Sequence, residues 1–380
     1  MLKKTVYLIS VVIISVVSLE ILLETYVVAR RALHGDASTF RRYQFGSHEG
    51  FEDMARLVSQ EDQAWNIGVA SLVATIDTDG LDLKSLTTDE HGFRNSCCAA
   101  EGPPKRTFLV LGGSTVLGVG TDDAHTIPSY LNRLGQDRGW VFRNLGIESN
   151  GSTEELLTLT LALRDGETPD DVIIYHGFND IYAAAVGYGT KSQNSTSVEV
   201  IIRSTTAYLY QKYIRNIALG RFLRRLGLHD GSNAKKALDP KKNAVAVIDL
   251  MKKTRDTALA LGRAYDFRVH HFLQPMLATG AEYDVGLLSP HLKQYYERSV
   301  TPEYRELTNM TYSALLQDGE WADLTRTFIE AEYSTPYYDQ IHLGPRGNEL
   351  IAQRIFEHLL EDAPASQAAA SEGQGEYSRK

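Results

Sequence analysis

Short apolar runs alternate along the chain with longer segments in which apolar residues recur at helical spacing. The short runs, which end at Gly, Asn, His or Gln and read as buried strands, cover residues 107–111, 140–145, 171–175, 268–273 and, more weakly, 321–324. The longer segments predict helices over 128–134, 153–164, 241–265 and 345–360. Thr126 is placed to cap the first of these helices. Strands that alternate with helices predict a parallel sheet covered on both faces.

The first predicted strand leads into a glycine-rich turn that carries two hydroxyl groups. Gly112 and Gly113 follow the apolar run, and Ser114 and Thr115 come next. Ligands of open α/β sheets bind at the carboxyl ends of the strands, so these hydroxyls lie at the edge where a site is expected. A capping serine in an ordinary turn fits the same residues, because Ser and Gly are common turn formers.

Three other glycine-rich motifs do not fit this turn. The nucleophile elbow of α/β hydrolases would need Gly where Val116 stands. A phosphate-binding Walker loop would need Lys where Val119 stands, and a dinucleotide fingerprint would need Gly at Asp123. A serine nucleophile remains, provided that a histidine and a carboxylate join it.

Such partners occur far downstream, just before the last predicted helix. Asp339 and His342 lie three residues apart in the segment YDQIHLGP. At this spacing one backbone turn can aim the carboxylate at the imidazole. The second ring nitrogen would then be able to take a proton from Ser114.

Taken in chain order, these residues resemble the SGNH (GDSL-type) hydrolases. The matching blocks are Gly-x-Ser after the first strand, a glycine after the second, residues 177–180 (Gly-Phe-Asn-Asp) after the third, and Asp-x-x-His before the last helix. The resemblance covers residues 106–360, an inserted segment excepted. It implies a three-layer α/β/α sandwich with a parallel, flavodoxin-like sheet, and a serine esterase or acyltransferase that needs no cofactor and no metal ion.

The resemblance also implies a role for each matching residue. Ser114 corresponds to the nucleophile, His342 to the general base and Asp339 to the acid that orients it. The oxyanion hole would draw on Ser114, Ser149, Gly151 and Asn179.

Two positions depart from the family pattern. Gly113 stands where the family has the Asp of Gly-Asp-Ser, which leaves the nucleophile in place. In the second block, the family's oxyanion glycine falls on Ser149, with Gly151 two residues later. A serine can still supply the backbone N–H that an oxyanion hole needs.

The amino-terminal segment is apolar over residues 5–29, interrupted by Glu20 and Glu24 and flanked by basic residues. It is long enough to cross a bilayer, and no small-x-small cleavage site follows it. We therefore expect an uncleaved single-pass transmembrane helix rather than a signal peptide. The charges on its two sides do not decide the orientation. The resemblance, rather than the charges, places the catalytic domain outside the cytoplasm.

The remaining boundaries follow from composition. We expect the anchor at 1–35, a neck that packs on the domain at 36–104, the hydrolase-like domain at 105–362 with an insertion at 181–240, and a disordered tail at 363–380. Within the insertion, residues 205–228 show a helical pattern with basic residues. This segment is either a helix packed on the domain or a lid or membrane-surface helix.

Composition narrows the classes of partner. The chain has 380 residues with 43% hydrophobic content and a formal net charge of −9, which argues against a nucleic-acid binder. Its two cysteines, Cys97 and Cys98, are adjacent, which is unusual for a structural disulfide, and they show no metal-ligand spacing. The oligomeric state is not indicated.

Four functions are consistent with these residues. Hydrolysis of a small-molecule, glycan or lipid ester by Ser114 comes first, and acyl transfer to a cell-surface glycan comes second. A catalytically weak glycan-binding accessory protein and a phosphate- or flavin-binding loop at residues 112–115 are the others. The last leaves Asp339 and His342 without a role.

Overall fold

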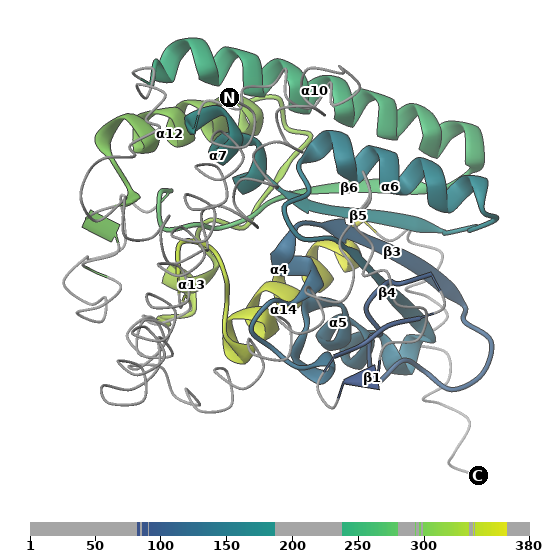
Figure 1. Cartoon of the computed structure of the whole chain (residues 1–380). Helices are drawn as coiled ribbons and strands as arrows, with labels where there is room; N and C mark the ends of the chain where they lie inside the picture. The colour runs from purple at the N-terminus through teal and green to yellow at the C-terminus, as the bar shows by residue number, and fades with distance from the viewer. Residues whose placement is uncertain are drawn as a thin grey trace, which may run out of the picture. The chain divides into compact units, whose positions relative to one another are not determined.

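A computed structural model of the chain has a five-stranded parallel sheet at its centre (Figure 1). The strands are β3 (Arg106–Gly112), β4 (Trp140–Gly146), β5 (Asp171–His176), β6 (Arg268–Leu273) and β7 (Ala322–Asp323). Their order across the sheet is β4-β3-β5-β6-β7, the doubly wound order in which the chain begins inside the sheet and reverses direction once. The predicted parallel α/β sheet is confirmed.

Helices cover both faces of this sheet (Figure 1). They are α4 (Ser114–Leu117), α5 (Ile127–Gly135), α6 (Ser152–Arg164), α7 (Phe178–Ala185), α10 (Pro240–Tyr265), α12 (Pro302–Leu316), α13 (Thr327–Glu330) and α14 (Pro345–Glu361). Figure 1 shows α6 and α10 on one side of the strands, and α4, α5 and α14 on the other. Thr126 caps α5 as predicted, its side chain accepting a hydrogen bond from the Ser129 N–H.

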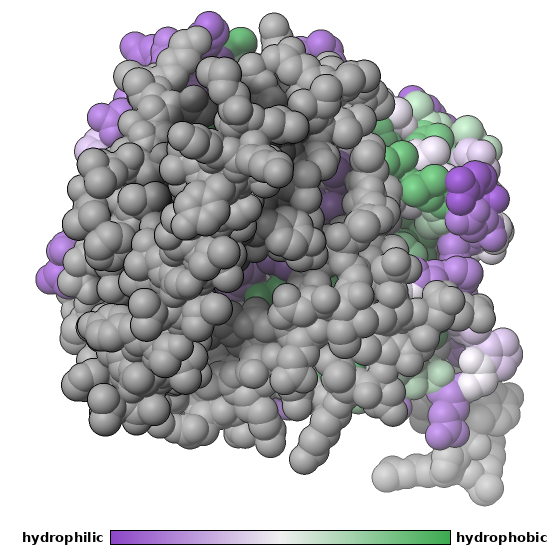
Figure 2. Space-filling model, viewed as in Figure 1, coloured by the Kyte–Doolittle hydropathy of each residue, from purple (hydrophilic) through white to green (hydrophobic). Residues whose placement is uncertain are grey.

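Successive side chains of β3 point to opposite faces of the sheet and contribute to two separate hydrophobic clusters. Phe108 and Val110 belong to the larger buried cluster, whereas Leu109 and Leu111 belong to a second cluster that includes α6. All four side chains are fully buried, as expected of a central parallel strand. Where the described residues reach the surface in Figure 2, hydrophobic and hydrophilic residues are interspersed.

Three helices differ from the sequence prediction. Helix α12 was not predicted, because four of its six buried positions are Thr or Tyr rather than aliphatic residues, namely Tyr304, Thr308, Thr311 and Tyr312. Helices α4 and α7 begin where the motif residues end the strands, so their sequences read as turns. Helix α7 also overlaps the first residues of the predicted insertion at 181–240.

The structure describes residues 82–83, 86–89, 91–186, 238–279, 293, 296–297, 299–333, 337 and 339–362. The predicted anchor, the basic helical segment at 205–228 and the tail at 363–380 lie outside these residues, as does most of the predicted neck. Within the part of the chain that the structure describes, no helix is both long and apolar enough to cross a membrane.

The described end of the predicted neck packs against the domain. A short hairpin of β1 (Asp82–Leu83) and β2 (Leu86–Thr87) precedes a segment that leads to Cys97 and Cys98. These cysteines form a disulfide with each other, so the expectation from their adjacency is wrong. Cys98 has a φ of 68°, in the left-handed region. An extended backbone would direct the side chains of Cys97 and Cys98 to opposite sides, whereas this turn lets them meet.

A polar cluster is buried between α6 and the carboxyl ends of β5 and β6. His176 Nδ1 lies 2.9 Å from Glu155 Oε2, and the His176 ring stacks on Trp321 with centroids 5.0 Å apart. Burial, with the nearby charges of Asp180 and Glu154, raises the pKa of Glu155 well above its ordinary 4.5. Burial also lowers the pKa of His176 to about 4. His176 is therefore neutral at neutral pH, and Glu155 keeps its proton to higher pH than an exposed glutamate does.

These shifts predict how stability depends on pH. The unfolded chain releases the Glu155 proton near 4.5 while the folded chain retains it, so Glu155 costs stability as pH rises from 4.5 toward its folded pKa. His176 acts in the opposite window, because its contribution is lost as pH falls from 6.5 toward 4. We therefore expect Glu155→Gln to be more stable than the wild type, by an amount that grows with pH until the folded chain also releases the Glu155 proton.

Denaturant unfolding between pH 7 and 9 measures this difference. Glu357→Gln, at an exposed acid on α14, is the control and should change the free energy of unfolding by less than about 0.5 kcal/mol at every pH. A difference between Glu155→Gln and the wild type that stays constant with pH would show that Glu155 is already ionised in the folded state over this range.

Candidate active site

Two glycines set the position of the segment that carries Ser114. A Cβ at Gly146, the last residue of β4, would lie 2.3 Å from the Leu117 backbone nitrogen in α4. A Cβ at Gly112 would lie 2.6 Å from the Tyr175 carbonyl oxygen. Neither gap admits a side chain, because the groups in the way are backbone atoms or a packed core residue. Helix α4 therefore lies directly against the ends of β3 and β4.

Hydrogen bonds from two side chains, Arg94 and Asn144, hold α4 in this place. Arg94, buried at 2% exposure, donates to the carbonyls of Leu117 and Gly118 at 3.1 and 2.8 Å. Asn144 in β4 donates to the Val116 carbonyl at 2.9 Å. Arg94 was not predicted to matter, because its turn-like sequence context shows no sign of the carbonyls it meets.

Ser114, His342 and Asp339 form a continuous hydrogen-bonded chain. His342 Nε2 lies 2.7 Å from Ser114 Oγ, across 228 residues of sequence. On the other side of the ring, His342 Nδ1 lies 2.5 Å from Asp339 Oδ2. Ser114 is 7% exposed, and the two loop side chains are less than a fifth exposed. The structure thus brings together the three residues that the sequence singled out.

The loop before α14 fixes the acid and the base together. The other carboxylate oxygen of Asp339 accepts the backbone N–H groups of Ile341 and His342 at 2.9 and 2.8 Å. Burial raises the pKa of Asp339, but the charge of His342 and these hydrogen bonds outweigh burial and lower the pKa below 3.8. Asp339 is therefore ionised at neutral pH and accepts the imidazole proton on Nδ1. His342 Nε2 then faces Ser114 with its lone pair.

Asn179 lies beside the nucleophile, at the start of α7. Its Nδ2 donates to the Asn150 carbonyl at 2.6 Å. A Cβ at Gly113, the residue before Ser114, would lie only 2.4 Å from the same Nδ2. The amide has a second hydrogen, which this arrangement leaves for a ligand at Ser114. The structure also accounts for the departure from Gly-Asp-Ser, since Asn179 occupies the space that an Asp side chain at 113 would need.

The second block of the site is only partly as expected. Ser149 has a φ of 64°, in the left-handed region that glycine adopts without strain. This conformation explains why the family pattern places glycine there. Gly151, the alternative oxyanion donor, uses its N–H on the Glu154 carboxylate at 3.2 Å. Of the two predicted backbone donors, Gly151 is therefore already engaged.

Asp180 was named as part of a motif but had no predicted role. Its buried carboxylate accepts the Ser152 N–H at 3.0 Å and the Ser152 hydroxyl at 3.0 Å. This ties the first residue of α6 to α7, so the loop at 149–151 and Asn179 keep a fixed spacing. The available sequence signal was the position of Asp180 directly after Asn179, the residue that the resemblance assigns to the oxyanion hole.

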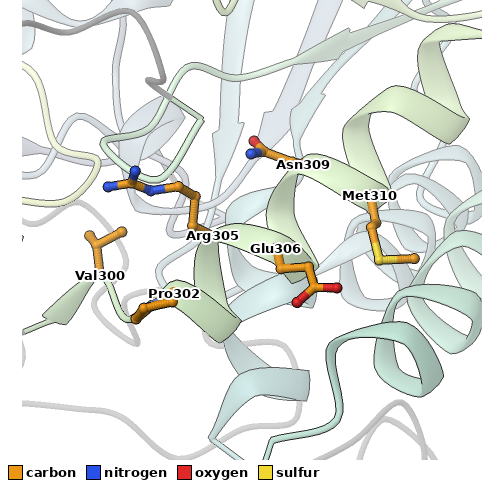
Figure 3. Close-up of a pocket in the computed structure, with 6 residues that line it drawn as sticks. All are labelled: Val300, Pro302, Arg305, Glu306, Asn309 and Met310. Carbon is orange, nitrogen blue, oxygen red and sulfur yellow. The ribbon is translucent and has the colours of Figure 1, made fainter.

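A pocket of about 470 Å³ lies away from these residues, along the first half of α12 (Figure 3). It is lined by Val300, Pro302, Arg305, Glu306, Asn309 and Met310. None of the predicted site residues belongs to it.

Comparison with known proteins gives matches to solved structures alone. No family model and no curated sequence matches the chain. An acetyl xylan esterase structure shares 13% identity, covering 66% of this chain and 98% of its own, with a TM-score of 0.35. An esterase from Pseudoalteromonas shares 14%, covering 68% and 98%, with a TM-score of 0.36. A lipolytic protein of the G-D-S-L family from Veillonella parvula shares 11%, covering 66% and 96%, with a TM-score of 0.36.

Two of these structures are named as esterases and one as a lipolytic G-D-S-L protein, the class that the sequence motifs resemble. The arrangement of Ser114, His342 and Asp339 is what bears on the chemistry.

Because Asn179 lies so close to Gly113, we expect substitutions at either residue to lower kcat. Asn179→Ala removes a donor for developing negative charge, so we expect kcat to fall about 100- to 1000-fold with little change in KM. Gly113→Ala retains Asn179 but displaces its amide, so kcat should fall as well. Gly113 has a φ of −84°, so the alanine backbone is unstrained and only space is at issue.

Hydrolysis of a model ester measures both variants, and thermal unfolding separates a catalytic loss from a folding defect. Gly113→Asp, which restores the family's motif, should be as impaired as Gly113→Ala. If Asn179→Ala kept full turnover but lost stability, Asn179 would be a capping residue only.

Proposed function

We propose that the chain is a serine-dependent ester hydrolase in which Ser114, His342 and Asp339 act as one catalytic unit. The observation that carries this proposal is the chain of hydrogen bonds of 2.7 and 2.5 Å from Ser114 through His342 to Asp339. A serine hydroxyl is a weak nucleophile at neutral pH unless a base takes its proton. A structural role for the same three residues would not require the ring to contact a buried hydroxyl.

In the first half of the reaction, Ser114 Oγ attacks the ester carbonyl and forms a new C–O bond. The hydroxyl proton passes to His342 Nε2, and Asp339 stabilises the resulting imidazolium. The negative charge on the former carbonyl oxygen is met by the Asn179 amide together with backbone N–H groups at Ser114 and Ser149. Collapse of this intermediate breaks the ester C–O bond, and His342 returns the proton to the departing alcohol.

In the second half, water replaces the alcohol. His342 takes a proton from the water as its oxygen attacks the acyl carbon, and the proton is then delivered to Ser114 Oγ as the carboxylic acid leaves. A sugar hydroxyl in place of this water would make the same site an acyltransferase. We take hydrolysis as the primary reaction.

We further propose that the substrate is an acylated glycan or lipid met at a membrane surface outside the cytoplasm. The apolar segment at residues 5–29 supports this, because it is long enough to anchor the chain beside such substrates.

Variants of the three residues test the proposed unit. Ser114→Ala and His342→Ala should each lower kcat by about 10⁴-fold or more, and the double variant should be little worse than either one. Asp339→Asn should cost less, because the base remains. The wild-type rate should fall at acidic pH, where His342 is protonated and no longer a base.

A fluorophosphonate probe gives an independent measurement, since it reacts only with an activated serine. It should label the wild-type chain and not Ser114→Ala, with circular dichroism confirming that both are folded. Unchanged ester hydrolysis in folded Ser114→Ala would exclude the mechanism. Product analysis with and without a glycan acceptor separates hydrolysis from transfer.

Alkaline carbonate extraction of membranes tests the anchor. We expect the full chain to stay with the membranes and a variant that lacks residues 1–33 to be released. Release of the intact full chain by carbonate would contradict the anchor, and it would leave the catalytic proposal unaffected.

A further inference from the structure

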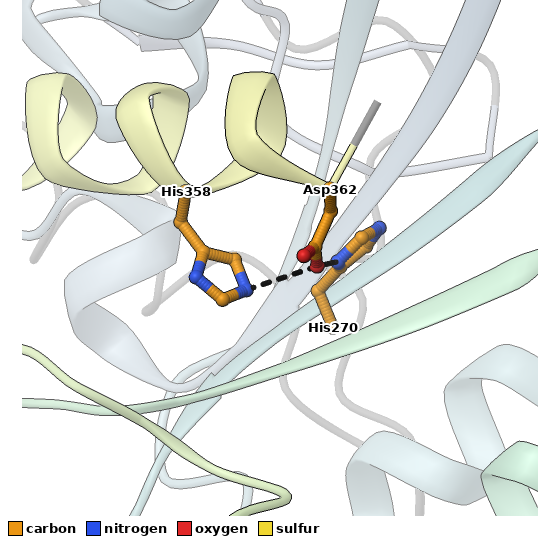
Figure 4. A group of neighbouring side chains, drawn as sticks. All are labelled: His270, His358 and Asp362. Atoms are coloured by element: carbon orange, nitrogen blue, oxygen red, sulfur yellow. Dashed lines mark ion pairs between the residues drawn. The ribbon is translucent and has the colours of Figure 1, made fainter. Parts of the chain in front are cut away.

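Three metal-ligating side chains meet at the end of the sheet opposite to Ser114. His270 is the third residue of β6, close to the amino-terminal edge of the sheet. His358 lies in the last turn of α14, and Asp362 is the residue at which that helix ends. Figure 4 shows the Asp362 carboxylate between the two imidazole rings. The proposed reaction uses none of these groups.

Their spacing matches what a tetrahedral ion requires. His358 Nε2 lies 3.3 Å and His270 Nδ1 lies 3.6 Å from Asp362 Oδ2. All three ligand atoms lie within 4.8 Å of one another. Zinc ligands at 2.0–2.1 Å from a tetrahedral ion are about 3.3 Å apart, so two of the three edges already have this length. His358 is about one-third exposed, so its ring has room to close the third edge.

A buried carboxylate orients His270 as a ligand. The other ring nitrogen, Nε2, lies 2.9 Å from Asp171 Oδ1, and Asp171 is fully buried. Asp171 also accepts hydrogen bonds from Arg106, which fixes the position of its carboxylate. The contact of Nε2 with Asp171 turns the other ring nitrogen of His270, Nδ1, toward Asp362. This carboxylate–histidine pair is the arrangement that supports histidines bound to metal ions.

The space between His270 Nδ1 and Asp362 is suited to a small cation. The Asp362 oxygen lies 3.6 Å from Nδ1, farther than a hydrogen bond, and both atoms can act as ligands of a metal ion. Arg268 does not fill this place, because its guanidinium bonds the Asp171 carboxylate and the Asp362 backbone carbonyl. Two imidazole ligands favour zinc over cations that bind through oxygen alone.

The geometry points to a binding site for a divalent transition-metal ion of the zinc type, formed by His270, His358 and Asp362. With three protein ligands, the fourth position of a tetrahedral ion is open to water. The ion joins the end of α14 to β6. Because α14 begins three residues after His342, the ion stabilises the helix on which the acid–base loop is mounted and takes no part in the ester chemistry.

Zinc chloride added to the purified, chelator-treated full chain tests this site. We expect the wild type to bind one equivalent of zinc more than His358→Gln and Asp362→Asn, and zinc to raise the Tm of the wild type but not of these variants. Loss of one ligand should weaken binding at this site at least about 10-fold. His125→Gln is the matched control, since His125 is an exposed histidine paired with Asp122 elsewhere in the fold.

Equal zinc stoichiometry and an equal Tm shift in the wild type and both variants would overturn the proposal. If either variant fails to fold, cobalt(II) titration of the wild type decides: visible absorption bands of a tetrahedral site support the proposal, and their absence overturns it. Ester hydrolysis should be the same with and without chelator, so failure of this site is distinguishable from failure of the proposed activity.

Discussion

The candidate active site depends on how closely α4 approaches the carboxyl ends of its neighbouring strands. The Ser114 hydroxyl is placed by backbone packed against backbone, at positions where Gly112 and Gly146 leave no room for a Cβ atom. Such contacts cannot relax as a surface side chain can, because the strands behind them form the core of the sheet. Asn144 and Arg94 then bind the carbonyls that this short helix leaves unpaired. The Ser114 hydroxyl is therefore held in place by the fold itself.

The acid and the base are placed by a different kind of constraint. Asp339 binds two backbone N–H groups of its own loop and the imidazole three residues later, so local geometry alone sets that pair. The loop in turn is fixed to the segment after β6, where the Leu277 N–H donates to the Gln340 carbonyl at 2.9 Å. The only contact in the unit that depends on the whole fold is the one between His342 and Ser114. Its length of 2.7 Å shows that the two constraints agree.

Sequence patterns predicted the sheet and the three central residues well, because both depend on local signals. Buried parallel strands are short apolar runs, and Asp-x-x-His carries its geometry in its spacing. The patterns did not predict α12. The hydroxyls of Thr308 and Thr311 donate to backbone carbonyls of the preceding turn, so these polar side chains can be buried among apolar ones. Arg94 was missed for another reason: its partners lie more than 20 residues away, and nothing near it in the sequence indicates them. Contacts of that kind exist only once the chain has folded.

The acid–base pair occupies four consecutive residues, whereas the nucleophile stands 228 residues earlier than the base. An insertion or deletion between α7 and α10 therefore leaves the Asp339–His342 geometry unchanged. It would alter the contact between His342 and Ser114 only by shifting one side of the sheet relative to the other. The β5–β6 pairing, which spans six residues on each strand, resists that shift. The geometry of Asp339 and His342 is thus independent of the length of the chain between α7 and α10.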